Sequence, residues 1–467
     1  MTLEIRLSVD KPDLLCQEGR DCGLTFRNLG RETIPVVPPP QSMSQPTLRV
    51  VDVKTAAETI FRERGSAVFR ERPVRLGPGR SLETGFDLRR AAPELPPGEY
   101  DLSVLHEETG SESAPVRLRV SPSLPTALTL DGVQSRVAYG FWVNPGSDGS
   151  HLVRTRFDFL RGGGIAEVRT IGATAARIRP IPSLFPNRIP GESHWIAWME
   201  GGVFKAVHFS PLSGPGPIDS FPMPDPTAEI IASLHSDPEP ESGARPLGAA
   251  LVWAEGKLRS LALAPGRVTG GPTWELPGPR PRWMRNHEDS TGRRTVLFAR
   301  CSNGRTSLYS VPWPNSDDPT TRLLGEWAGE WVAAGSTMDF DDRVHGGVLL
   351  WNAPEERWQC VPWTLSAAGE FTSRAPLAVA SAEDGDFDRA HVRVSATGAL
   401  FVLLRGKGAA WRMWEGRLRA LPEPIAHAGG AVDLGFSGGS EPVFILGRAG
   451  TGFHLLHPDG TPFPHEM

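Results

Sequence analysis

Short apolar runs joined by tight polar turns recur along most of this chain. The run WIAWMEGGVFKAV at 195–207 is followed about fifty residues later by ALVWAEGKLRSLA at 250–262. Similar stretches occupy 297–311 and 349–361. Two apolar runs separated by a polar turn that contains Gly are typical of a β-hairpin. The pattern therefore predicts a series of hairpins rather than a set of helices.

The hairpins recur at a nearly constant spacing. Their predicted centres fall near residues 147, 201, 256, 304, 355, 407 and 450. A strand-like run precedes each hairpin and another follows most of them, so each repeat of about fifty residues holds four strands. Four strands repeated seven times describe a seven-bladed β-propeller. We predict this propeller over residues 126–467, within an all-β protein.

The first part of the chain alternates differently. About seven short runs alternate polar and apolar residues with a period of two, among them 3–9, 47–53 and 98–106. A strand with one buried face shows this pattern, and turn signals such as Pro96-Pro97-Gly98 separate the runs. Seven short strands in about 120 residues predict an Ig-like β-sandwich over residues 1–122.

Composition supports this division. The 51 Gly and 45 Pro argue against long helices. All 14 Trp lie at or after Trp142, and together with the Pro-containing stretch 121–125 this change marks a domain boundary near 122–126. The net charge of −5 gives no overall field that would favour nucleic acid.

The N-terminus and the cysteines suggest a location. Residues 1–10 lack the basic and apolar parts of a signal peptide, and no apolar run of about 20 residues exists to span a membrane. The four cysteines, at positions 16, 22, 301 and 360, match no zinc spacing and are too few for a disulfide framework. We therefore expect a cytoplasmic protein with reduced thiols.

Some phrases resemble known families. In the first unit, LSVDKP, LTFRNLG and LPPGEYDLSV look like bacterial Ig-like domains of the intracellular proteinase inhibitor (BsuPI) type. This resemblance covers residues 1–122 and implies a fold rather than an activity. The later strands resemble those of WD40, kelch and TolB-type propellers, and 301–309 is similar to the TolB-type turn. The Trp-Asp dipeptide of WD40 is absent, and paired glycines such as those at 201–202 and 346–347 do not recur in every repeat as they do in kelch proteins, so the resemblance implies an architecture and no family.

The inner strand of each blade would line a central channel, where polar side chains are candidates for a ligand site. These candidates are His235, His287, Asp339 or Asp341, His391 and Asp433. A ring of His and carboxylate groups can hold a metal, but their offsets from the hairpins differ, so we predict no metal and no cofactor. The alternating carboxylates of 384–388 lack the later Gly and Glu of an EF-hand, and we interpret them as turn residues.

No nucleophile elbow, phosphate loop or zincin helix occurs in the sequence. The sequence therefore favours a non-enzymatic interaction or scaffold protein that binds protein partners. An enzyme with a metal or small-ligand site in the channel stays open as the alternative.

We letter the four strands of each blade A to D in chain order, with A as the inner strand. The predicted partner surface lies at one end of the propeller, where the loops from strand B to strand C meet the loops from strand D to strand A of the next blade. We expect long, irregular D-to-A loops at 221–226, 278–283 and 326–331. Trp and Arg are enriched in interface hot spots. The predicted partner-binding residues are Arg280, Arg282, Trp283, Arg285, Trp327 and Trp331. Packing between blades is the alternative role for the Trp residues.

We also expect the ring to lack an overlapping strand. The run 126–131 precedes the first hairpin at the distance of an inner strand, so it is predicted to belong to the first blade. Pairing of this run with the outer strand of the last blade would contradict the prediction.

Overall fold

The computed structural model shows an all-β fold. It describes residues 2–10, 12–16, 18–19, 21–36, 47–62, 73–92, 95–107, 109–123, 129–134, 137–146, 149–158, 164–174, 181–182, 194–210, 214–225, 227–236, 247–264, 266–276, 279–289, 294–312, 320–339, 341–406, 410–427, 432–437, 441–448 and 452–462. In these residues the α-helices are two short segments, α1 (Leu88–Ala91) and α2 (Glu423–Ala426). Single 3-10 turns occupy Ala353–Glu355 and Ala382–Asp384.

The first part of the chain forms two facing sheets. Its strands are β1 (Leu3–Val9), β2 (Asp13–Leu15), β3 (Asp21–Asn28), β4 (Ile34–Val36), β5 (Thr47–Asp52), β6 (Glu58–Phe61), β7 (Val74–Leu76), β8 (Ser81–Asp87), β9 (Gly98–His106), β10 (Ser111–Glu112) and β11 (Val116–Ser121). One sheet has the order β1-β3-β8 and the other β2-β11-β9-β5-β6, with β10 beside β9 and a separate β4-β7 pair. The β2-β11 pair is parallel and the others are antiparallel.

Period-two alternation places the core between these sheets. In β3 the side chains of Cys22, Leu24 and Phe26 are buried while the intervening residues are more exposed. They share one hydrophobic cluster with Leu102 and Leu118 of the other sheet. The predicted alternation of the first unit is therefore confirmed in these strands.

Seven antiparallel sheets follow, which we call blades 1 to 7. Blade 1 contains β12 (Thr129–Gln134), β13 (Val137–Gly146), β14 (Gly149–Asp158) and β15 (Gly164–Thr174). Blade 2 contains β16 (Ile181–Pro182), β17 (His194–Glu200), β18 (Val203–Ser210) and β19 (Gly214–Pro222), and blade 3 contains β20 (Glu229–Ser236), β21 (Leu247–Ala254), β22 (Lys257–Ala264) and β23 (Arg267–Trp274). Blade 4 contains β24 (Trp283–Glu288), β25 (Arg294–Ser302), β26 (Arg305–Pro312) and β27 (Arg322–Ala328).

The last three blades vary this plan. Blade 5 contains β28 (Glu330–Met338), β29 (Val344–Asn352), β30 (Arg357–Leu365), β31 (Phe371–Ser373) and β32 (Leu377–Ser381); blade 6 contains β33 (Phe387–Val394), β34 (Leu400–Gly406), β35 (Trp411–Trp414) and β36 (Leu418–Ala420); blade 7 contains β37 (Val432–Ser437), β38 (Glu441–Arg448) and β39 (Gly452–Leu456). In blade 5 both β31 and β32 pair with β30. The predicted hairpins are confirmed in all seven blades, since the second and third strands pair throughout.

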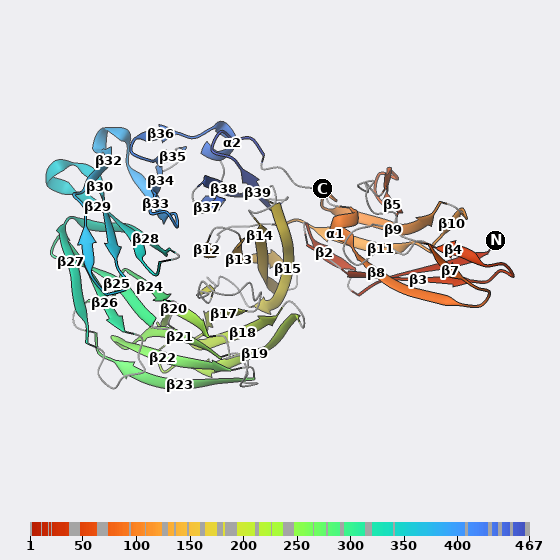
Figure 1. The fold of residues 1–467 in the computed structure, drawn as a ribbon, viewed down its shortest axis with the longest axis horizontal. Coiled ribbons are helices and arrows are strands. Elements are labelled where there is room, and N and C mark those ends of the chain that lie inside the picture. The colour runs from red at the N-terminus through yellow and green to blue at the C-terminus, as the bar shows by residue number, and fades with distance from the viewer. Residues whose placement is uncertain are drawn as a thin grey trace.

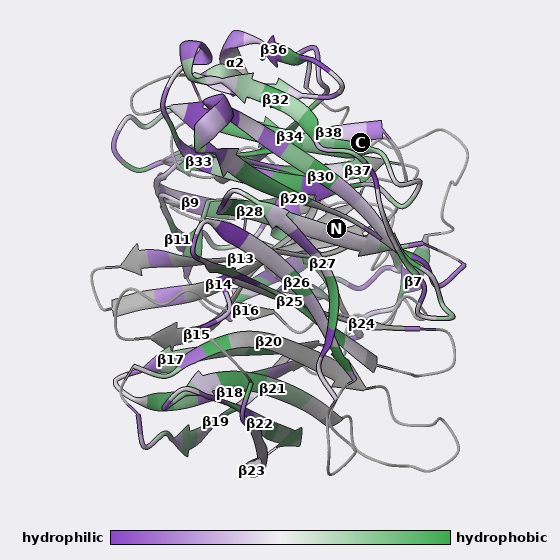
Figure 2. Cartoon of the chain, turned by 90° about the vertical axis from the view of Figure 1, so that its left-hand side faces the viewer, coloured by the Kyte–Doolittle hydropathy of each residue, from purple (hydrophilic) through white to green (hydrophobic). Residues whose placement is uncertain are grey.

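Stacking covers both faces of a blade, which explains the continuous apolar runs. In β21 the consecutive residues Ala250, Leu251 and Val252 are all fully buried. Ala250 and Val252 pack in the cluster shared by blades 2 and 3, whereas Leu251 packs in the cluster shared by blades 3 and 4. Figure 2 shows the resulting hydrophobic stretch along β21. A strand with two covered faces loses the alternation that marks a half-buried strand.

The blades form a β-propeller, with their first strands near its axis (Figure 1). Strand β12 pairs with β13 as the innermost strand of blade 1, so the prediction that the ring lacks an overlapping strand is confirmed in the described residues. Blades 1 and 7 meet through contacts of β12 with β37 and of β15 with β39. The two-sheet unit lies beside blade 1, where Asn144 Nδ2 lies 3.5 Å from the carbonyl oxygen of Pro122.

Candidate functional site

The B-to-C turns and the D-to-A segments are hydrogen-bonded to each other at one end of the propeller, which we call the B–C end. It comprises the turns 201–202, 255–256, 303–304 and 353–356 and, among the described residues, the segments 223–225, 227–228, 275–276, 279–282, 329 and 382–386. The same contact recurs in three blades: Met223 N donates to Gly202 O (2.9 Å), Gly329 N to Gly304 O (2.8 Å) and Ala382 N to Glu356 O (2.8 Å). Each contact ties the segment that leaves a blade to the turn of that blade.

Asp225 extends this connection to the next blade. Its Oδ2 accepts a hydrogen bond of 2.8 Å from the backbone N of Glu255, in the turn of blade 3. Hydrogen bonds from Thr227 and from the Glu255 backbone hold the pKa of Asp225 below its usual range. Asp225 therefore links the segment that leaves blade 2 to the turn of blade 3.

The predicted loop residues lie mostly in strands. Trp327 belongs to β27 and Trp331 to β28, and Gly329 is the residue between these strands. The expectation of an irregular loop over 326–331 is therefore wrong. Gly329 has a φ of 130°, which permits the close reversal that residues with side chains rarely adopt. Trp283 and Arg285 likewise lie in the inner strand β24 rather than in a loop.

The three Trp residues of the predicted surface are half-buried and pack between blades. Trp283, Trp327 and Trp331 all contact the cluster that joins blades 4 and 5. The ring centroid of Trp327 lies 6.4 Å from that of Phe371. The packing role weighed for these residues is therefore present, whereas partner binding by them stays a prediction.

The predicted arginines differ in exposure. Arg280 is exposed and forms an ion pair with Glu229. Arg282 is also exposed, and its backbone N donates to the Ala299 carbonyl at 2.8 Å. Arg285 is half-buried in the inner strand, close enough to His287 to affect its titration. Arg280 and Arg282 are therefore at the B–C end as predicted, and Arg285 is not.

The polar residues of the inner strands link neighbouring blades in pairs. His287 Nε2 in β24 lies 2.9 Å from Ser336 Oγ in β28. Burial lowers the pKa of His287 to about 3, and the positive charge of Arg285 adds to this shift. His287 is therefore neutral at physiological pH.

The second pair joins blades 6 and 7 by a buried ion pair. Arg393 Nε lies 2.8 Å from Asp433 Oδ1, and Arg393 Nη2 lies 2.5 Å from Asp433 Oδ2. Burial acts to raise the pKa of Asp433, but the charges of Arg393 and His391 and the hydrogen bonds outweigh burial and hold it below its usual value. Asp433 therefore stays ionised in a nearly fully buried position.

The remaining channel candidates do not gather into one site. Asp339 accepts hydrogen bonds from the backbone N of Asp341 and from His345 Nε2, both at 2.8 Å, within one hairpin. Asp384 bonds to Ser381 in the turn before β33, as interpreted from the sequence. The side chain of His235 lies outside the described residues. In the described part of the chain, no group of three or more His, Cys, Asp or Glu side chains is placed to hold a metal.

One buried arginine was missed by the sequence reasoning. Arg300 in β25 is only 4% exposed, and its guanidinium carbon lies 4.9 Å from the ring centroid of Phe298. A charged residue within the apolar run LFARCS was the available signal. That this position is normally apolar becomes clear only when β25 is compared with the equivalent strands of other blades.

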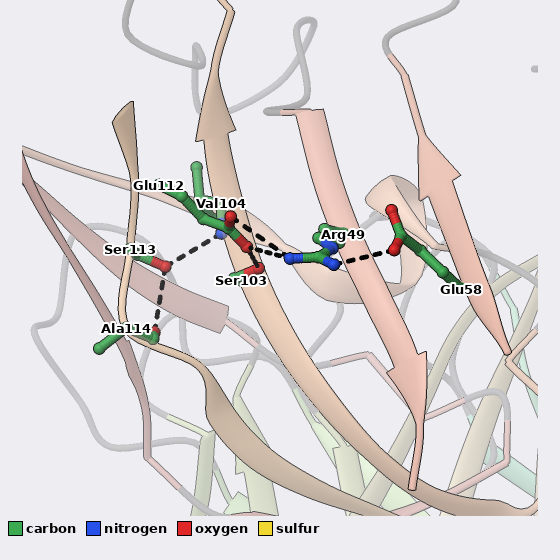
Figure 3. A network of polar contacts seen from close by, with 7 residues as sticks. All are labelled: Arg49, Glu58, Ser103, Val104, Glu112, Ser113 and Ala114. Atoms are coloured by element: carbon green, nitrogen blue, oxygen red, sulfur yellow. Dashed lines mark hydrogen bonds and ion pairs between the residues drawn. The ribbon is translucent and has the colours of Figure 1, made fainter. Parts of the chain in front are cut away.

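The two-sheet unit carries a charged network on its outer face (Figure 3). Arg49 Nη2 lies 2.9 Å from Glu58 Oε2, and Arg49 Nη1 lies 3.2 Å from Glu112 Oε1. Ser103 Oγ also donates to Glu112. The side chains of Arg49, Glu58 and Glu112 are more than a third exposed, so water screens this network.

No disulfide joins Cys16, Cys22, Cys301 and Cys360 to one another in the structure. Among the described residues, no helix has the length and apolar character needed to cross a membrane.

Comparison with known proteins gives structural likenesses alone. No protein-family model and no curated protein matches the sequence. The β-propeller domain of Cps50 (Swd1) from Myceliophteria thermophila is similar, with 14% identity, 71% of this chain and 96% of that chain covered, and a TM-score of 0.42.

Two further structures show the same degree of likeness. The β-propeller domain of the Trilobed protease from Pyrococcus furiosus, described as having an open velcro topology, has 9% identity, 73% and 97% coverage and a TM-score of 0.37. A protein from Lactobacillus plantarum has 14% identity, 73% and 96% coverage and a TM-score of 0.40. The propeller assignment rests on the seven sheets of this chain, and identities this low say nothing about activity or partners.

Proposed function

We propose that this chain is a non-enzymatic interaction protein that binds a protein partner at the B–C end around blade 4. The observation that carries the proposal is the repeated hydrogen bond between each D-to-A segment and its B-to-C turn, seen at Met223, Gly329 and Ala382. A surface that is already ordered loses less conformational entropy when a partner binds. The exposed side chains of Arg280 and Arg282 lie on this ordered end.

The six residues predicted from the sequence keep different roles in this proposal. Arg282 is the best candidate for direct contact, because it is exposed and its backbone is fixed to Ala299. Arg280 would have to exchange its ion pair with Glu229. Trp283, Trp327, Trp331 and Arg285 would support the surface from below, through their half-buried positions.

The proposal includes an Ig-like module over residues 1–122, joined to the propeller at 122–126. Tyr100 supports the Ig-like topology, because its hydroxyl donates to the Pro96 carbonyl at 2.7 Å. A Tyr at the start of strand F that bonds backwards to the main chain is a recurring feature of Ig-like sandwiches. Strand β9, which begins just before Tyr100, lies between β11 and β5 as strand F lies between G and C. We also propose a cytoplasmic location, with which the absence of a disulfide among the four cysteines is compatible.

The test is retention of a host protein on the immobilised full chain, identified by mass spectrometry. We expect Arg282→Ala to lose a partner that the unaltered chain retains, with an unchanged melting temperature. Arg343→Ala is the matched control, because Arg343 is exposed in the hairpin at the opposite end. Equal loss in both variants, or loss in neither, would place the interface elsewhere.

A further inference from the structure

Arg300 occupies a position that neighbouring blades fill with apolar side chains. It lies two residues before the last pair of the hairpin, Ser302 with Arg305. Trp198 and Val252 hold the same place in blades 2 and 3. The exposed fractions of Trp198, Val252 and Arg300 are 1%, 0% and 4%. Blade 4 therefore buries a guanidinium where the fold accepts an apolar residue.

Aromatic rings support this guanidinium from one side. Its carbon lies 4.9 Å from the ring centroid of Phe298 and 5.8 Å from that of Tyr309. The two rings are stacked, with centroids 5.0 Å apart and planes at 12°. Both rings belong to the seam between blades 3 and 4. Cation–π attraction offsets part of the cost of burying the charge.

The polar requirements of Arg300 are not met. Its Nε and Nη2 atoms are buried and have no hydrogen-bond partner. Across the described residues, no carboxylate lies within ion-pair distance of Arg300. Glu326, in the same row of the sheet beyond Ser307, is already held by Arg305 Nε at 2.7 Å and Ser307 Oγ at 3.0 Å. Burial accordingly lowers the pKa of the Arg300 guanidinium.

A second arginine lies beside this position at the surface. Arg282 is exposed, and its backbone is bonded to Ala299, the residue before Arg300. Within the part of the chain that the structure describes, Arg282 forms no ion pair. The seam between blades 3 and 4 thus ends in two cations, one buried and one exposed. A buried charge without a counter-charge is costly, and a bound anion removes this cost.

We propose that the seam between blades 3 and 4 at the B–C end binds a carboxylate of an acidic peptide segment, with Arg300 as the buried anchor and Arg282 as the outer contact. This inference rests on the proposed function and names the chemistry of the partner. A guanidinium presents a planar pair of donors that matches a carboxylate. The carboxylates of Glu229 and Glu326 nearby and the net charge of −5 repel a polyanion such as nucleic acid more strongly than a short acidic segment.

The test measures binding of a fluorescein-labelled peptide of about eight glutamates to the full chain by fluorescence anisotropy; charge-assisted hydrogen bonds set the expected effect. Arg300→Met should weaken binding by roughly tenfold or more, and Arg282→Ala should weaken it less. Arg300→Met should melt at the same temperature as the unaltered chain or higher, because an uncompensated buried charge has been removed. Arg343→Ala should change neither quantity.

Three further arms separate the explanations. Arg300→Lys keeps the charge without the paired donors, so it should fold and bind weakly even if the Met variant does not fold. Peptides of glutamine or lysine of equal length should not bind. Tighter binding of a single-stranded oligonucleotide than of the glutamate peptide would overturn the proposal in favour of nucleic acid.

Two other outcomes would also overturn it, and they can be told apart from failure of the proposed function. Unchanged peptide binding together with a lower melting temperature in Arg300→Met would make Arg300 a packing residue. If the glutamate peptide does not bind but Arg282→Ala still loses a host partner, the acidic chemistry is wrong and the interaction role stands. If no variant alters partner retention, the proposed interaction surface itself is wrong.

Discussion

The two-sheet unit and the propeller place their charged side chains in opposite environments. In the two-sheet unit, Arg49, Glu58 and Glu112 meet on an outer face that is open to water (Figure 3). In the propeller, Asp433 and Arg300 are almost completely buried. The number of covered faces explains the difference, because the two-sheet unit covers one face of each sheet and a blade is covered on both.

This difference has an energetic consequence. A charge on a wet face can lose its partner and be solvated by water, so it contributes little to stability. A charge within a blade seam has no such alternative, and its partner determines whether the position is stable or strained. The seams of the propeller should therefore be sensitive to single polar substitutions, and the outer face of the two-sheet unit should tolerate them.

Among these substitutions, Asp433→Asn should reduce the stability of the protein most strongly. The substitution keeps the shape of the side chain but leaves Arg393 beside an uncharged partner in a seam where the Asp433 side chain is 2% exposed. We expect a loss of about 3 kcal/mol in the free energy of unfolding, measured with urea. The double variant Asp433→Leu with Arg393→Met should recover much of this loss. A cost below about 1 kcal/mol for the single variant would show that the pair is hydrated.

Acid should weaken the seam at His287 by a smaller amount. The pKa of His287 falls from 6.5 to about 3 on folding, so its contribution is complete above pH 6.5 and is lost as the pH falls toward 3. Each pH unit within this window costs about 1.4 kcal/mol, which predicts a loss of about 2 kcal/mol between pH 7 and pH 5.

His287→Gln is the control for this titration, because Gln can bond Ser336 but does not titrate in this range. Urea unfolding at the two pH values should show a weaker pH dependence in the variant. If the free energy of unfolding changes equally with pH in both proteins, groups other than His287 cause the acid sensitivity.

Arg49→Ala should have the smallest effect. Its removal leaves Glu58 and Glu112 exposed to solvent, where water replaces the lost contacts. We expect a melting temperature close to that of the unaltered chain, and a difference that shrinks further as salt is added. A drop as large as that of Asp433→Asn would contradict the contrast between the two regions.

The sequence predicted those parts of the fold that local pattern determines. The turns at Gly256 and at Asn303–Gly304 were readable because their backbones require positive φ values, which Gly and Asn adopt readily. Tyr100 could not be interpreted in the same way, since its hydrogen bond to Pro96 depends on a topology that the strand pattern leaves open.

The candidate site was predicted less well than the fold, for reasons visible in particular residues. The polar stretch 326–331 reads as a loop, although β27 runs to Ala328 and β28 starts at Glu330, because the sequence does not show that Gly329 alone reverses the chain. Arg300 was missed because its environment is supplied by Phe298, Tyr309 and the seam with blade 3, which no single repeat encodes. Contacts between repeats follow from the packing of blades and not from the spacing along the chain.

The absence of a borrowed strand, in the described residues, bears on how the ring is made during translation. Each blade is built from consecutive strands, and β12 pairs with β13 directly after it rather than with β39 near the end of the chain. The strands of a blade can therefore pair as soon as its own residues have left the ribosome, without a strand synthesised hundreds of residues away, although the faces of the blade are covered only when its neighbours stack on it. Such local pairing shortens the time for which strand edges stay exposed to other chains.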